Sequence, residues 1–163
     1  MLEQSALLLR PWPTAADAGA DGAARRWIVD AATAAPLGFA CWQAPPGKQW
    51  WSWLLPAVLA VHEVEDEPLL FTVCRFWGLG PSWVVRDADD RLVATVRRRR
   101  IEDRFGQTVL RVEAGPDGAC LFQGRSGHEA GTLTRSPEGI RVTFAAAANP
   151  FTRMALLAAA LRW

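Results

Sequence analysis

Residues 149–163, the last segment of the chain, place the strongest constraint on its fold. Asn149 is a residue type that caps helices, and Pro150 suits the first helical position, where its missing N–H costs no hydrogen bond. Every residue from 154 to 161 is apolar, so the helix that we expect here has no polar face over two turns. A helix that is apolar all round is buried in protein or in lipid, so something has to surround this segment on every side.

The length of this helix favours burial in protein. At 1.5 Å per residue it spans only about 20 Å, whereas the hydrocarbon core of a bilayer is ~30 Å thick. We therefore expect a core helix and no transmembrane segment. The apolar run at residues 7–9 is also too short for the hydrophobic region of a secretory signal peptide.

Short apolar strands alternate with turns in the chain that precedes the helix. The turns contain Gly, Pro or Asp, which fix or permit turn conformations. In residues 140–144, apolar side chains alternate with Arg141 and Thr143, as they do on a strand with one buried face. The sequence predicts five hairpins, with strands at 27–30 and 37–42, 58–64 and 69–75, 83–86 and 92–97, 108–113 and 119–123, and 130–135 and 140–144.

These hairpins supply ten strands, and the N-terminal segments are expected to add up to two, including an edge strand within residues 1–12. Evenly spaced short strands indicate a barrel or sandwich. Eight strands make a barrel filled by its own side chains, whereas about twelve leave room for a helix of ~10–12 Å diameter. The predicted fold class is mainly β (α+β): a closed antiparallel barrel of about twelve short strands around a hydrophobic C-terminal helix. We expect one domain, 1–163, with a less regular N-terminal segment 1–26 and a central helix at 149–163.

Residues 50–61 fit this pattern least well, because they are almost all apolar and contain a cluster of tryptophans. Tryptophan clusters suit a membrane interface. The alternative, which we favour, is a buried loop that leads into the second hairpin.

Three features of the chain resemble one protein family. They are the repeated hairpins such as 83–97, the acidic strand and turn at 63–71, and a final strand that runs into an apolar C-terminal helix. Over residues 27–163 this pattern resembles the tubby C-terminal-like superfamily, and within it the phospholipid scramblase and LURP-one-related branch. The resemblance implies a twelve-stranded antiparallel barrel around a hydrophobic helix. Tubby itself binds phosphoinositides through basic residues on the barrel, but no motif transfers those positions to this chain.

The chain also departs from the scramblases. Eukaryotic scramblases carry an acidic, calcium-binding-like segment before the final helix, a Pro-rich N-terminal region and a cysteine cluster for palmitoylation. Residues 139–149 contain no carboxylate, and the other two features are not present. Calcium-triggered scrambling is therefore not expected.

The densest positive charge is the run of four arginines at 97–100. Guanidinium groups bind phosphate oxygens in a bidentate manner. On one continuous strand, alternate arginines would project to opposite sides and at most half would form one patch. A solvated strand end balanced by Glu102 and Asp103 is the more ordinary interpretation. The candidate residues for binding an anion or a lipid headgroup are Arg97, Arg98, Arg99, Arg100 and Arg104.

Other patterns in the sequence that could suggest a metal site or catalysis are better explained as turns and solvated loops. Residues 87–90 look like the start of a calcium loop, but the loop lacks the required Gly and Glu further on, so a turn is predicted. The acids within 63–67 suit a solvated hairpin, and residues 78–81 form a turn without a phosphate-loop lysine. His62 and His128 have no recognisable nucleophile or metal-ligand partner in the sequence. We predict no catalytic residues, no metal ligands and no cofactor.

The composition of the chain limits the classes of partner and the cellular setting that we expect. A net charge of +1 gives no nucleic-acid-like charge excess, so no nucleic-acid partner is expected. Three widely separated cysteines support neither a disulfide framework nor a zinc site, which indicates a reduced, cytoplasmic setting. We expect a non-enzymatic cytoplasmic barrel that binds anionic lipid headgroups, a phosphorylated ligand or the inner face of a membrane peripherally. The alternatives are scramblase-like lipid translocation and a purely structural or interaction module.

Overall fold

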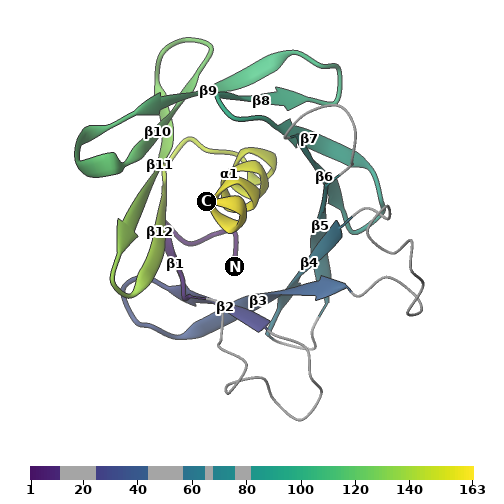
Figure 1. The fold of residues 1–163 in the computed structure, drawn as a ribbon, viewed down its shortest axis with the longest axis vertical. Coiled ribbons are helices and arrows are strands. Elements are labelled where there is room, and N and C mark those ends of the chain that lie inside the picture. The colour runs from purple at the N-terminus through teal and green to yellow at the C-terminus, as the bar shows by residue number, and fades with distance from the viewer. Residues whose placement is uncertain (12–24, 44–56, 65–67, 76–81) are drawn as a thin grey trace.

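The computed structural model describes residues 1–11, 25–43, 57–64, 68–75 and 82–163. Figure 1 shows a ring of strands with a helix inside it. The strands are β1 (Ala6–Leu9), β2 (Arg25–Asp30), β3 (Pro36–Gln43), β4 (Ala57–Glu63), β5 (Leu69–Arg75), β6 (Trp83–Asp87), β7 (Leu92–Val96), β8 (Arg100–Asp103), β9 (Thr108–Ala114), β10 (Cys120–Gly124), β11 (Glu129–Ser136) and β12 (Gly139–Phe144).

The twelve strands form one closed barrel in which each strand pairs antiparallel with its neighbours in sequence. β1 completes the ring, because Leu7 lies opposite Val142 of β12 and Leu8 lies opposite Val29 of β2. The predicted closed antiparallel barrel of about twelve strands is therefore confirmed. The expectation of an N-terminal edge strand is wrong, since β1 is hydrogen-bonded on both sides.

Alternating side chains fill the barrel. In β12, Ile140, Val142 and Phe144 are buried while Arg141 and Thr143 are exposed, as the sequence predicts. Five of the hairpins match the predicted ones, and β8 is the strand that the prediction left out. It has a single aliphatic residue, Ile101, which is fully buried.

Aspartates close several of the turns by accepting backbone hydrogen bonds. Asp87 Oδ1 accepts from the N–H groups of Asp89 and Arg91, at 3.0 and 2.8 Å. Asp103 Oδ1 accepts from Phe105 and Gln107 in the same way, at 2.9 Å each. The turn predicted at residues 87–90 is therefore confirmed, and Asp103 serves its own turn.

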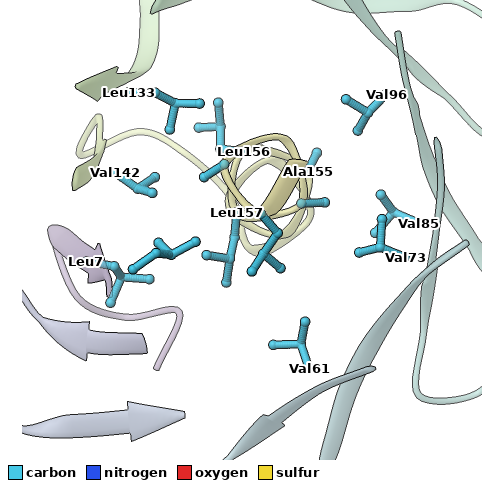
Figure 2. Close-up of a cluster of buried hydrophobic side chains, with 14 of the residues drawn as sticks. Leu7, Val61, Val73, Val85, Val96, Leu133, Val142, Ala155, Leu156 and Leu157 are labelled. Atoms are coloured by element: carbon cyan, nitrogen blue, oxygen red, sulfur yellow. The ribbon is translucent and has the colours of Figure 1, made fainter. Parts of the chain in front are cut away.

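Helix α1 (Pro150–Arg162) runs through the barrel and ends the fold. Asn149 caps it as predicted, with its side-chain oxygen accepting from the N–H of Thr152 at 2.8 Å. Leu156 and Leu157 are fully buried. Figure 2 shows inward side chains from strands on several sides of the helix pointing toward it, among them Leu7, Val61, Val73, Val85, Val96, Leu133 and Val142.

Two arginines fix the ends of this apolar helix. At its first turn, the Arg153 guanidinium donates to the carbonyl oxygens of Ala148, Leu2 and Gln4. At its last turn, Arg26 of β2, which is only 6% exposed, donates to the carbonyls of Leu161 and Arg10. Burial lowers the pKa of Arg26. These contacts bind the helix to the N-terminal residues and to the barrel wall.

Candidate functional site

The run of four arginines does not lie on one strand. β7 ends at Val96, Arg98 and Arg99 form a bend, and Arg100 begins β8. The N–H of Arg97 donates to the carbonyl of Arg100 at 2.9 Å and closes this tight connection. The alternation considered for a continuous strand therefore does not apply, and a hairpin turn presents the arginines at one end of the barrel.

Glu102 balances part of this charge, as one interpretation of the sequence anticipated. Its Oε2 accepts from Arg97 Nε at 2.9 Å, and its Oε1 lies 2.7 Å from Arg100 Nε. The hydrogen bond from Arg97, followed by the charges of Arg97 and Arg100, holds the pKa of Glu102 below its usual range. Asp103 does not share this role. Arg98 and Arg99 are exposed and make no ion pair with any described residue.

The neighbouring strand adds more positive charge. Arg100 lies directly opposite Arg111 of β9 in the ladder, and like charges in opposite positions repel. Glu113, two residues further along the outward face of β9, is the nearest acid in that strand. The ion pair between Arg100 and Glu102 offsets part of this repulsion.

A cavity of about 350 Å³ opens at this end of the barrel, beside the last turn of α1. Three arginines line it: Arg97, Arg98 and Arg162. The remaining walls are mostly apolar and include Phe122 and Trp163. We call the group Arg97, Arg98, Arg99, Arg100, Arg111 and Arg162 the arginine end.

Arg162 is the least expected member of the arginine end. It is half-buried, and burial together with the nearby charge of Arg75 lowers its pKa. No carboxylate of the described chain pairs with it. Sequence reasoning overlooked Arg162 because it treated the run at 97–100 as a linear cluster. The predicted central helix could have revealed it, since the last turn of such a helix emerges at one mouth of the barrel.

Arg104 lies apart from the other four predicted residues. It follows β8, whereas Arg100 begins that strand, so about 13 Å of extended chain separates them. The Arg104 guanidinium lies over the ring of Phe105, 4.7 Å from its centroid. The structure therefore brings Arg97, Arg98, Arg99 and Arg100 together and leaves Arg104 at the opposite mouth.

Within the ranges that the structure describes, the other polar groups singled out in the sequence do not gather into a cluster. His128 Nδ1 bonds to the Ser126 hydroxyl within one turn, and no described carboxylate orients the ring. His62 stacks on Phe39 at 5.2 Å. Among the described residues no three potential ligands gather to hold a metal ion. Residues 50–56, 65–67 and 78–81 lie outside the described part of the chain.

Within the described ranges, no helix has both the length and the apolar character needed to cross a membrane. Comparison of the chain with protein-family models, with curated proteins and with solved structures finds no match. The resemblance to tubby-like and scramblase-related proteins stays a prediction.

Proposed function

We propose that this barrel binds the anionic headgroups of a membrane surface at its arginine end, without catalysing a reaction. The observation that carries the proposal is the cavity lined by Arg97, Arg98 and Arg162. Glu102 is the acid beside it, and its two oxygens are already used by Arg97 and Arg100. An anion placed there meets Arg98 and Arg162, which pair with no carboxylate of the described chain.

The chemistry of these groups suits phosphate. Each guanidinium presents a planar fork of N–H donors that matches two phosphate oxygens. Arg98 and Arg99 are exposed at the bend, so they can approach a surface without breaking an existing ion pair. Near an anionic membrane each arginine contributes about 1 kcal/mol.

Vesicle co-sedimentation tests this proposal. The probe is a vesicle of phosphatidylcholine with or without phosphatidylserine, at graded salt. Wild-type protein should bind the anionic vesicles and release them as salt rises, because salt screens exposed charges. Arg98→Glu with Arg99→Glu should lower the affinity at least about tenfold, since two contributions of about 1 kcal/mol are lost and repulsion is added.

A matched control changes the net charge equally at the opposite mouth. Arg104→Glu with Arg125→Glu alters two exposed arginines outside the arginine end, and it should leave vesicle binding within about twofold of wild type. Equal losses in both variants would mean that net charge, and not this site, drives binding. Equal binding by wild type and the Arg98/Arg99 variant would sink the headgroup proposal and favour a structural module.

Lipid translocation needs a separate measurement. It would require α1 to enter lipid, whereas its Leu156 and Leu157 are fully buried in the barrel. A dithionite assay on labelled vesicles with the protein added measures translocation directly.

A further inference from the structure

A second cavity lies at the barrel mouth opposite the arginine end. It measures about 470 Å³, a size typical of small-molecule sites. Its lining residues come mainly from the first turns of α1 and from the strands β7 to β9 with their connecting turns. Its walls include the apolar side chains of Leu92, Val93, Ala94, Val109, Leu110 and Ala155.

Small side chains on facing elements explain why this space exists. Ala94 projects from β7 and Ala155 from α1, and both are buried at 3% and 2% exposure. Leu156 and Leu157, the next two residues of the helix, fill the interior in other directions. Both alanines line the cavity, so the space lies where larger side chains on β7 and α1 would have filled it.

Two aromatic side chains at this cavity are unusually exposed. Phe105 is 72% exposed and Phe151 is 59% exposed, the highest values among the large hydrophobic residues of the described chain. Both line the same cavity. Exposed apolar surface that gathers at an apolar hollow is the usual sign of a binding site.

The charges at the rim indicate what kind of ligand fits. Arg91 and Arg104 line the cavity together with Asp87 and Asp103, so the rim is balanced. Asn149 and Thr152 add uncharged polar groups. A charged ligand end would meet as much repulsion as attraction, whereas an uncharged hydrogen-bonding end would find both donors and acceptors.

We propose that this cavity binds an uncharged amphiphile, with its apolar body between α1 and β7–β9 and one hydroxyl-like end at the rim. Phe105 and Phe151 cover the apolar body at the entrance. The site is independent of the headgroup site, because it lies at the other mouth and shares no lining residue with the cavity of the arginine end.

Fluorescence of N-phenyl-1-naphthylamine, a neutral apolar probe, tests the site. The probe should brighten with wild-type protein, and 1-decanol should displace it. Decanoate and decylammonium, which have the same chain length, should each displace it at several-fold higher concentration. No brightening, or no displacement by decanol, would overturn the site. If decanoate or decylammonium bound more tightly than 1-decanol, the proposal that the ligand is uncharged would be wrong.

Two kinds of variant locate the binding. Ala155→Leu fills the cavity and should abolish displaceable probe binding. Should that variant fail to fold, Phe105→Ser with Phe151→Ser changes only exposed side chains and should weaken probe binding by about tenfold. The matched control is Val64→Ser, an exposed apolar residue that does not line the cavity, and it should bind like wild type. Equal binding by the Phe105/Phe151 variant and this control would refute the site.

The Arg98/Arg99 double variant separates the two proposals. This variant should no longer bind anionic vesicles, but decanol should still displace the fluorescent probe from it. Loss of the decanol response in that variant would show that probe and vesicle share one site and would overturn this inference.

Discussion

The fully buried helix residue Leu157 offers the sharpest test of the barrel architecture. Its side chain is 0% exposed and lies inside the ring of strands. Leu157→Ala removes that apolar volume and leaves a cavity that the surrounding strands can close only in part. Substitutions of this type cost about 2–5 kcal/mol. Total stability of a domain is only about 5–15 kcal/mol, so the change removes a substantial share.

The expected loss of stability is large enough to measure by thermal unfolding. For a chain of this size, 1 kcal/mol shifts the melting temperature by about 2–4 °C, so a loss of about 3 kcal/mol predicts a decrease of roughly 6–12 °C. Circular dichroism during heating, repeated with urea, measures both the midpoint and the free energy of unfolding. Leu157→Asp should be worse, because it buries a charge without a partner.

Phe151→Ala is the control on the same helix. Phe151 is 59% exposed, so the loss of its side chain should cost less than about 1 kcal/mol. If Leu157→Ala melted no lower than Phe151→Ala, the helix would not be the core of this protein and the barrel-around-helix reasoning would be refuted.

Two further predictions concern polar groups. Arg153→Met removes the donors to the carbonyls of Leu2, Gln4 and Ala148 and should lower the free energy of unfolding in urea by roughly 1–3 kcal/mol. The control is Arg141→Met, which changes an outward side chain and should lower it little. Equal losses in the two variants would contradict the role given to Arg153. Glu102→Gln should destabilise the protein at neutral pH, because the lowered pKa of Glu102 means that its ionised form stabilises the fold. That contribution is complete above the ordinary carboxyl pKa of about 4.3 and is lost as the pH falls through the lowered pKa of the folded state, so the gap between wild type and variant should close in acid; a gap that stays constant with pH would argue against the ion pairs.

The sequence contains enough local information to predict most of the barrel. Alternation and turn residues identify the five hairpins, and the all-apolar segment identifies the central helix. β8 escaped prediction because its four residues are Arg100, Ile101, Glu102 and Asp103, which show no apolar alternation. Glu102 can be buried there only because Arg97 and Arg100 pair with it, and such pairing depends on the folded hairpin.

The candidate site could be predicted only in part, because some of its residues are close in the sequence and others come together only in the fold. The run at 97–100 is visible in the sequence, but its division between a turn and β8 is not. Arg162 follows Arg100 by 62 residues in the sequence, yet it lines the same cavity as Arg97 and Arg98. Only the path of α1 through the barrel brings these residues to one cavity. Closure by β1 is similarly long-range, because it pairs the start of the chain with β12.

The axial position of α1 determines whether either cavity is correctly built. Apolar packing is non-directional, so a helix that is apolar all round has no preferred height inside an apolar barrel. Hydrogen bonds supply that preference: Arg153 ties the first turn to the N-terminal residues, and Arg26 ties the last turn to β2. The same two contacts set Ala155 beside the apolar cavity and Arg162 beside the arginines. The two cavities therefore depend on the position of a single helix, which polar contacts hold along the barrel axis and apolar contacts keep buried.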